Sequence, residues 1–130
     1  MAVDLKAGVH GSRPMARLDY VELPTATAHE LTQAFYAKAL GWSFTGYGPD
    51  YSAAGTGASE LGLNGDREDG LSAPLPLIRT DAIEALLDAV IAAGGVISRP
   101  IFGFPGGRRF QFIDPSGSEV GIYQPESDEA

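Results

Sequence analysis

Hydrophobic and polar positions change from a strand-like to a helix-like pattern early in the chain. Residues 17–23 alternate, which predicts a strand with Leu18, Tyr20 and Glu22 on one face and Asp19 on the other. An apolar stripe at helical spacing follows and predicts an amphipathic helix. Its members are Leu31, Phe35 and Leu40, with Ala34 and Ala39 beside them. Short β-like runs complete this half of the chain, at residues 42–45, 51–54 and 59–64.

The second half of the chain repeats this order. An apolar run at residues 75–79 predicts a buried strand, and a second helical stripe follows it. Pro105 and Gly106, and later Pro115 and Gly117, favour tight turns between the strands that come next. The stripe comprises Ile83, Leu86, Leu87, Val90 and Ile91, and the later strands are expected at residues 96–102, 108–113 and 119–124. The chain thus predicts a strand, a helix and three strands twice, repeating after about 55 residues.

Both predicted helices carry start and stop signals. Thr27 followed by Glu30 has the spacing of a capping box before the first helix. A similar pair, Asp81 and Glu84, precedes the second helix. Glycines stand where helices commonly end on a left-handed residue, at Gly41 and at residues 94–95. We therefore expect both helices to begin with a side-chain cap and to end at glycine.

The composition is that of an ordinary globular domain. Of the 130 residues, 44% are hydrophobic and 20% charged, which is enough for one sizeable core. Seventeen acidic residues against nine Lys and Arg give a net charge of -8, which would repel nucleic acid. The absence of cysteine excludes disulfides and thiolate chemistry, and no apolar run approaches the ~18 residues of a membrane span. A cytoplasmic protein without nucleic-acid or membrane partners is expected.

The two ends of the sequence differ from the patterned region. Residues 1–16 are polar and lack periodicity, which is typical of an N-terminal arm or of a vector-derived leader. Residues 125–130 carry three acidic side chains and are expected to form a solvated tail. A single domain is therefore predicted over residues 17–124, with one module at 17–64 and the other at 73–124.

Three stretches of the sequence resemble the vicinal oxygen chelate superfamily, which includes glyoxalase I, bleomycin-resistance proteins and extradiol dioxygenases. The most specific is residues 104–123, FPGGRRFQFIDPSGSEVGIY, which resembles the closing hairpin of that superfamily. Residues 18–23 resemble its opening strand, and Phe35-Tyr36 through Leu40-Gly41-Trp42 resembles its "FY…LGW" helix end. The resemblance implies an α+β fold in which two βαβββ modules form a cup-shaped, curved mixed sheet with the helices outside. It also implies a homodimer.

In metal-dependent members of the superfamily, His, Gln or Glu side chains on the inner face of the cup bind a divalent metal. The resemblance places the ligand of the opening strand at Tyr20 and that of the closing strand at Gly121. A histidine position falls near residues 75–77, where there is no histidine, and Glu60 overlays the remaining carboxylate. A neutral phenol and a glycine are poor ligands, so no metal and no cofactor is expected.

The histidine content agrees with this expectation. The chain has two histidines: His10 in the predicted arm, and His29 in the first helical turn, where it is expected to face solvent. A divalent metal held by a nonstandard set remains the alternative. The candidate ligands of that set are Glu22, Glu60, Gln111 and Glu119.

Strand alternation predicts which side chains line the cup. Phe110 and Phe112 are expected to face the helices, which turns Arg109 and Gln111 toward the cup. The candidate ligand-binding residues are Tyr20, Glu22, Arg109, Gln111, Glu119 and Tyr123. The same residues also allow a purely structural interpretation, in which Arg109 pairs with Glu119 across a hairpin, Glu22 faces solvent and the tyrosines pack. A proton-transfer pair formed by Glu22 and Glu119 is a further alternative.

These observations favour a glyoxalase- or bleomycin-resistance-like protein without the usual metal triad, which binds a small polar metabolite or antibiotic in its cup. Two carboxylates there would favour an amine-bearing ligand. The alternative is a metal-dependent lyase, isomerase or dioxygenase of the same superfamily that uses the nonstandard set.

Overall fold

Two βαβββ modules follow one another along the chain, in the predicted order. The structure is a computed structural model that describes residues 14–69 and 71–126. The first module comprises β1 (Ala16–Pro24), the 3₁₀ helix η1 (Ala26–Ala28), α1 (His29–Leu40), β2 (Thr45–Gly46), β3 (Tyr51–Gly55) and β4 (Glu60–Asn64). After the 3₁₀ turn η2 (Arg67–Asp69), the second comprises β5 (Leu75–Thr80), α2 (Ile83–Ala92), β6 (Val96–Phe104), β7 (Gly107–Ile113) and β8 (Glu119–Pro125).

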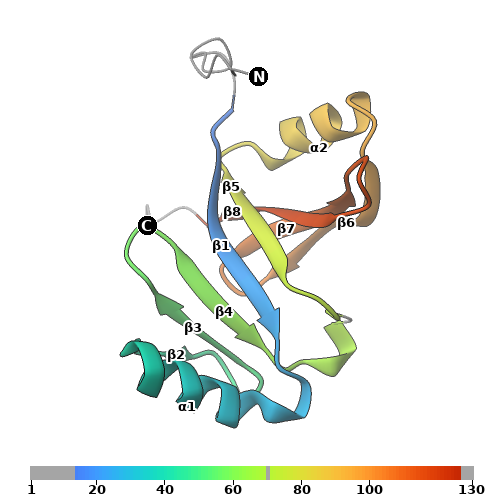
Figure 1. The fold of residues 1–130 in the computed structure, drawn as a ribbon. Coiled ribbons are helices and arrows are strands. Elements are labelled where there is room, and N and C mark those ends of the chain that lie inside the picture. Colours follow the sequence, from blue (N-terminus) through green and yellow to red (C-terminus); the bar gives the residue numbers. More distant parts are fainter. Residues whose placement is uncertain (1–13, 70, 127–130) are drawn as a thin grey trace, which may run out of the picture.

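All eight strands join one mixed sheet in the order β2-β3-β4-β1-β5-β8-β7-β6. The modules meet at its centre, where β1 and β5 pair antiparallel. Each of these strands also pairs parallel with the last strand of its own module, β1 with β4 and β5 with β8. Figure 1 shows the sheet curving, with α1 beside β2 and β3 and α2 near the opposite edge. The predicted α+β fold with a curved mixed sheet is confirmed.

The second module holds the main apolar core. Ile83 and Phe110 are fully buried and Ile122 is 3% exposed, so α2 closes over β7 and β8. The stripe predicted for this helix packs there as expected through Leu86, Leu87 and Val90, whereas its last member, Ile91, is 53% exposed. Neither α1 nor α2, the α-helices of the described region, has the length and apolar character needed to cross a membrane.

The apolar stripe of α1 points away from the sheet, unlike that of α2. Leu31 is 77% exposed, Phe35 62% and Leu40 53%. The partly buried positions of the helix are instead His29, Thr32, Gln33 and Tyr36, whose spacing puts them on one face. His29 Nε2 lies 3.3 Å from the hydroxyl of Ser52 on β3, which identifies this polar face as the one toward the sheet.

The predicted side-chain caps do not form, because other groups occupy the helix starts. α1 begins after Ala28 with no side-chain cap, since Thr27 lies inside η1. In α2 the N-cap position is Ala82, and the N–H of Ile83 donates to the side-chain carbonyl of Gln124 on β8 at 3.0 Å. Asp81 accepts a hydrogen bond from the backbone N–H of Met15 instead of capping the helix. The capping-box predictions are therefore wrong.

The glycine stop signals are confirmed. Gly41 has φ 74° and its N–H donates to the carbonyl of Ala37, and Gly94 has φ 101°. After Gly41 the chain departs from expectation, because the run at 42–45 contributes only Thr45 to a strand. Trp42 instead stacks on Tyr36, with ring centroids 5.8 Å apart. The first strand also has an irregularity, a register shift between Leu18 and Tyr20 that leaves Leu18 63% exposed.

Candidate functional site

The helix-free face of the sheet carries all six candidate ligand-binding residues. Phe110 and Ile122 pack in the core beneath α2, so their neighbours along β7 and β8 point to the opposite face. Strand register aligns Arg109 with Tyr123 on that face, and Gln111 with Gly121. The six are Tyr20 and Glu22 on β1, Arg109 and Gln111 on β7, and Glu119 and Tyr123 on β8. Their role in ligand binding stays a prediction.

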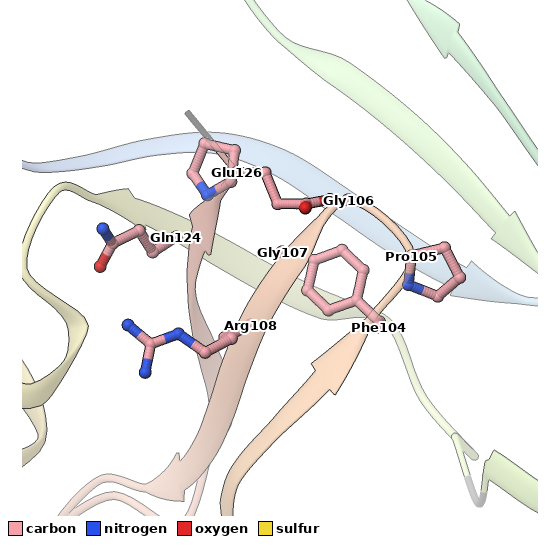
Figure 2. A pocket seen from close by; sticks show the side chains of 8 residues that line it. Phe104, Pro105, Gly106, Gly107, Arg108, Gln124 and Glu126 are labelled. Carbon is pink, nitrogen blue, oxygen red and sulfur yellow. The ribbon is translucent and has the colours of Figure 1, made fainter. Parts of the chain in front are cut away.

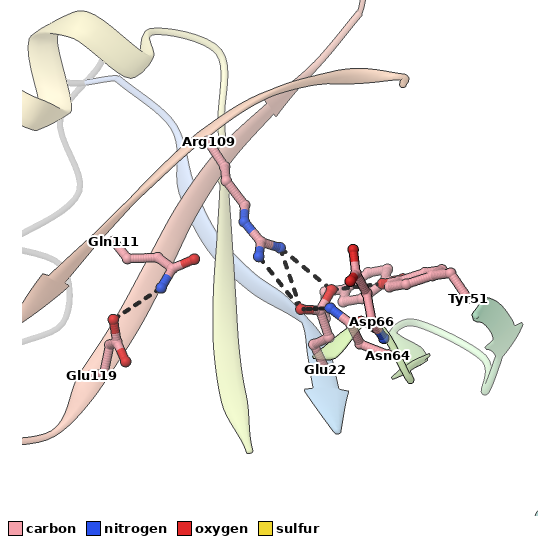
Figure 3. Close-up of polar contacts among 8 residues, drawn as sticks. Glu22, Tyr51, Asn64, Asp66, Arg109, Gln111 and Glu119 are labelled. Atoms are coloured by element: carbon pink, nitrogen blue, oxygen red, sulfur yellow. Dashed lines mark hydrogen bonds and ion pairs between the residues drawn. The ribbon is translucent and has the colours of Figure 1, made fainter. Parts of the chain in front are cut away.

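A buried ion pair joins Glu22 of the first module to Arg109 of the second. Their side chains are 3% and 10% exposed, and the guanidinium nitrogens lie 3.3–3.5 Å from the carboxylate oxygens. The strands β5 and β8 separate β1 from β7, so the strand spacing alone would put the two Cα atoms at least about 14 Å apart on a flat sheet. The contact therefore requires the sheet to curl around this face, which makes it the inside of the cup (Figure 3).

Two structural expectations are corrected by this pair. Glu22 does not face solvent, since it is 2% exposed. Arg109 does not pair with Glu119 across the hairpin between β7 and β8, because its guanidinium reaches over the neighbouring strands to Glu22. The alternation of side chains predicted the face that each residue occupies but not the partner that it meets there.

Tyr51 and Asn64 complete the surroundings of the Glu22 carboxylate. The Tyr51 hydroxyl donates to Oε2 at 2.8 Å and the Asn64 side-chain amide donates to Oε1 at 3.2 Å. The hydroxyls of Tyr20 and Tyr51 are 2.6 Å apart, and because the Tyr51 proton is directed to Glu22, Tyr20 is the donor between them. Neither Tyr51 nor Asn64 was among the candidates, although each lies at the end of a run predicted to be β-like.

Burial keeps these phenols neutral. Burial raises the pKa of Tyr20 to about 12, and the nearby Glu22 carboxylate adds to this effect. Burial, again followed by the charge of Glu22, raises the pKa of Tyr51 well above its usual value. Tyr123 also has a raised pKa, from burial and from its 2.8 Å hydrogen bond to Asp19. At neutral pH all three therefore act as hydrogen-bond donors rather than as bases or anionic ligands.

A second polar cluster surrounds Glu119. Its Oε2 accepts hydrogen bonds from the Gln111 side-chain amide at 2.9 Å and from the Ser98 hydroxyl at 2.8 Å. Gln111 is only 7% exposed, and within the described residues its carbonyl oxygen Oε1 has no hydrogen-bond donor. In Figure 3 this oxygen points away from Glu119, toward the side of the face where Arg109 meets Glu22. An unpaired buried carbonyl costs about 1–3 kcal/mol, so this atom favours a donor from outside the chain.

The four positions that the resemblance assigns to metal ligands do form one row. Strand register pairs Glu60 with Tyr20, Tyr20 with Leu77, and Leu77 with Gly121 across β4, β1, β5 and β8. Leu77 is 4% exposed, and a Cβ added at Gly121 would overlap its Cδ2 atom. Gly121 therefore opens no room for a ligand, because a leucine fills the space above it. A neutral phenol, a leucine and a glycine do not fit a divalent metal.

The nonstandard metal set does not converge either. Glu22 is enclosed by Arg109, Tyr51 and Asn64, whereas Glu119 belongs to the separate cluster with Gln111 (Figure 3). Across the described ranges 14–69 and 71–126, no three His, Asp or Glu side chains gather as metal ligands would. Glu22 and Glu119 lie in different clusters and do not contact each other there, so these contacts do not support a proton-transfer pair formed by the two.

His29 lies away from the cup, on the helix side of the sheet. His10 lies outside the described residues. The sequence predicts that His29 faces solvent, but this prediction is wrong. Its ring nitrogens lie 2.8 Å from the hydroxyl of Thr25 and 3.3 Å from that of Ser52. It therefore helps to join α1 to β3.

A shallow hollow of about 420 Å³ lies outside the cup, at the turn between β6 and β7 and the end of β8 (Figure 2). Phe104 and Pro105 form part of its wall. Two of its polar side chains already serve the fold, because Arg108 pairs with Glu84 and Gln124 holds the start of α2, and its carboxylate, Glu126, is exposed. The hollow thus offers no polar group comparable to Gln111.

Comparison with known proteins supports the fold through sequence similarity and through similarity to solved structures. No family model matches the chain. It is 30% identical over 121 residues to "Putative glyoxylase CFP32" of Mycobacterium bovis and of Mycobacterium tuberculosis, a match that covers 82% of this chain and 44% of the relative. The chain thus spans less than half the length of these curated relatives.

Solved structures with the same fold include three of known type. A methylmalonyl-CoA epimerase from Mycobacterium tuberculosis superposes with a TM-score of 0.69 at 13% identity, over 85% of this chain and 89% of the other. A glyoxalase/bleomycin resistance protein/dioxygenase superfamily member from Vibrio splendidus gives 0.61 at 18%, over 86% and 99%. The Mn(II)-bound glyoxalase from Novosphingobium aromaticivorans gives 0.61 at 19%, over 89% and 44%.

The paired modules and the curled mixed sheet define a protein of the glyoxalase fold. Together with the sequence similarity to the mycobacterial proteins, they support the resemblance of the chain to the vicinal oxygen chelate superfamily.

Proposed function

We propose that this protein binds a small polar organic ligand, a metabolite or an antibiotic, in the cup formed by its sheet, and that it does so without a divalent metal. The observation that carries the proposal is the row Glu60, Tyr20, Leu77 and Gly121. Three of its four residues offer no anionic or imidazole donor, and Leu77 packs over Gly121.

The chemistry of the ligand follows from the unpaired oxygen of Gln111. A ligand that presents an amine, amide or hydroxyl donor beside Oε1 would satisfy this buried acceptor. Glu119 lies next to Gln111 and adds a carboxylate that favours the same kind of group. The buried carboxylate of Glu22 is already neutralised by Arg109 and attracts a cation less. An amine-bearing ligand is therefore expected at the Glu119 side of the cup.

The metal-free part of the proposal is tested by thermal shift with Ni²⁺, Zn²⁺, Mn²⁺ and Fe²⁺, together with elemental analysis of protein purified without chelator. We expect no stoichiometric metal and no metal-dependent stabilisation of the native chain. The positive control is the triple variant Tyr20→His, Leu77→His and Gly121→Glu, which restores donors along the row beside the native Glu60. A native chain that gains stability from one equivalent of metal refutes the proposal.

The ligand part is tested by a thermal-shift screen of small polar amines, amides and hydroxy compounds. For any compound that raises the Tm, Gln111→Leu should abolish the shift, because it removes the acceptor. The matched control Gln33→Leu, on α1 and away from the cup, should leave the shift unchanged. A compound that stabilises both variants equally binds somewhere else.

A further inference from the structure

A β-bulge in β6 directs an arginine into the cup. Ile97 and Arg99 are two residues apart on β6, yet they pair with adjacent residues of β7, Phe112 and Gln111. Ile97 packs in the core beneath α2, and strict alternation from it would turn Arg99 to the same side. The extra residue of the bulge instead sets Arg99 opposite Gln111, and directly opposite residues of an antiparallel pair share a face. Arg99 therefore belongs to the cup, although it was not among the candidate residues.

Phe102 orients the guanidinium of Arg99 on this face. A second bulge, between Arg99 and Phe102, brings Phe102 opposite Arg109 and therefore also into the cup. The guanidinium carbon of Arg99 lies 3.7 Å from the centroid of the Phe102 ring, which is a cation–π contact. Stacking uses the flat face of a guanidinium, whereas a carboxylate is bound by the N–H groups along its edge. Arg99 can therefore stack on Phe102 and bind a carboxylate at the same time.

Gln111 lies on the strand between one that carries a cation and one that carries an anion. β7 separates β6, with Arg99, from β8, with Glu119, and the Glu119 carboxylate accepts a hydrogen bond from the Gln111 amide at 2.9 Å. Glu22 and Arg109 already neutralise each other, so the field beside Gln111 is set mainly by Arg99 and Glu119. This part of the cup thus presents opposite charges on the two sides of a buried acceptor.

We propose that the ligand of the cup is a small zwitterion of the amino-acid type, with its ammonium group at Gln111 and Glu119 and its carboxylate at Arg99. This inference rests on the proposed function, which it narrows from polar donors in general to one class of compound. The ammonium group supplies the donor that Gln111 Oε1 lacks among the described residues, and Glu119 attracts its charge. The carboxylate matches the parallel N–H groups of Arg99. A simple amine makes the first contact only, and the charge of Arg99 opposes it.

The first test is calorimetric titration of the full chain with a panel of L- and D-amino acids. For each amino acid that binds, the carboxamide lacks the carboxylate and the N-acetyl derivative lacks the ammonium group, so each should bind at least about tenfold more weakly. A derivative that binds as tightly as its amino acid overturns the inference, and so does a panel without any binding at about 10 mM. The proposed function survives these results if the screen of amines, amides and hydroxy compounds yields a ligand that depends on Gln111.

The second test assigns the carboxylate to Arg99. Arg99→Gln should weaken binding of the amino acid at least about tenfold and leave binding of its carboxamide nearly unchanged, whereas Arg99→Lys keeps the charge and should recover part of the loss. The matched control is Arg108→Gln, on β7 but on the helix side, where Arg108 pairs with Glu84; it should bind both compounds as the native chain does. Native affinities in Arg99→Gln overturn the inference. An equal loss for both compounds also overturns it, because Arg99 would then act through the fold.

Discussion

Glu22→Gln should destabilise this protein more than any other single charge removal in the cup. The substitution removes the Glu22 charge that faces the Arg109 guanidinium, at a position where only 10% of the arginine side chain is exposed. Removing one partner of a buried ion pair costs about 3–5 kcal/mol. A whole domain is stable by about 5–15 kcal/mol, so the loss is a large fraction of the total.

The assay is urea unfolding followed by circular dichroism, with the free energy of unfolding taken from the midpoint and slope. Arg109→Met should cost less than Glu22→Gln, because Tyr51 and Asn64 still donate hydrogen bonds to the carboxylate. The double variant should cost less than the sum of the two single losses, since it removes both charges together. The exposed ion pair offers a control: Glu84→Gln, which loses its contact with Arg108, should move the midpoint little.

Additive losses, or a Glu22→Gln variant that unfolds at the native midpoint, would refute the reasoning. Either result would mean that the two charges are not coupled and that the ion pair does not hold the modules together. A changed urea slope with an unchanged midpoint would also contradict it, because the effect would then lie in compactness and not in the pair.

Three further measurements follow from individual contacts. Burial raises the pKa of Tyr20 to about 12, from about 10 in the unfolded chain. The stability associated with the neutral phenol is therefore present below pH 10 and is lost as the pH rises through the folded pKa. Tyr20→Phe should reduce this alkaline loss when the free energy of unfolding is measured across pH. Gly121→Ala should cost about 1–3 kcal/mol in urea unfolding through overlap with Leu77, and Leu77→Val should recover part of it; an unchanged Gly121→Ala would show open space there. Arg108 lowers the pKa of Glu84 by its hydrogen bond, so Arg108→Ala should raise that pKa in an NMR titration, and an unmoved resonance would contradict the contact.

The repeated module could be predicted from the sequence because its signals are local. In the second module, alternating strands and the stripe of α2 agree with the packing of Ile83, Phe110 and Ile122. Turn signals worked for the same reason: Asp114 accepts backbone hydrogen bonds from Ser116 and Ser118 in the turn that Pro115 and Gly117 predict. Such features depend on a few neighbouring residues, which a pattern can represent.

The orientation of α1 could not be predicted in this way. Its stripe of Leu31 and Phe35 is the kind that usually faces a core, yet the polar face with His29 meets β3. A pattern shows that a helix has an apolar side but not which body covers that side. The same limit explains the failed caps, since the group that meets the N–H of Ile83 comes from Gln124, 41 residues away.

The contacts between side chains in the cup could not be predicted from the alternation of residues along the strands. Period-two alternation put Glu22 and Arg109 on one face, but their contact depends on how far the sheet curls across two intervening strands. Tyr51 and Asn64 were missed because they become neighbours of Glu22 only through the pairing of β3 with β4 and of β4 with β1. Residue type and spacing thus identified the charged groups, and the strand order decided their partners.

The polar groups of the cup divide into a structural part and a part available for binding. A metal held in the row at Tyr20, Leu77 and Gly121 would tie strands of both modules together. In a cup that works without metal, as we propose, that connection falls to the pair of Glu22 and Arg109, in which each acceptor oxygen is used. Groups that hold the fold closed are poorly suited to exchange partners with a ligand, because breaking them costs stability. The buried oxygen of Gln111, which has no donor among the described residues, is therefore where a ligand gains most. The difference between Glu22→Gln, which should lower stability, and Gln111→Leu, which should lower binding, separates the two roles.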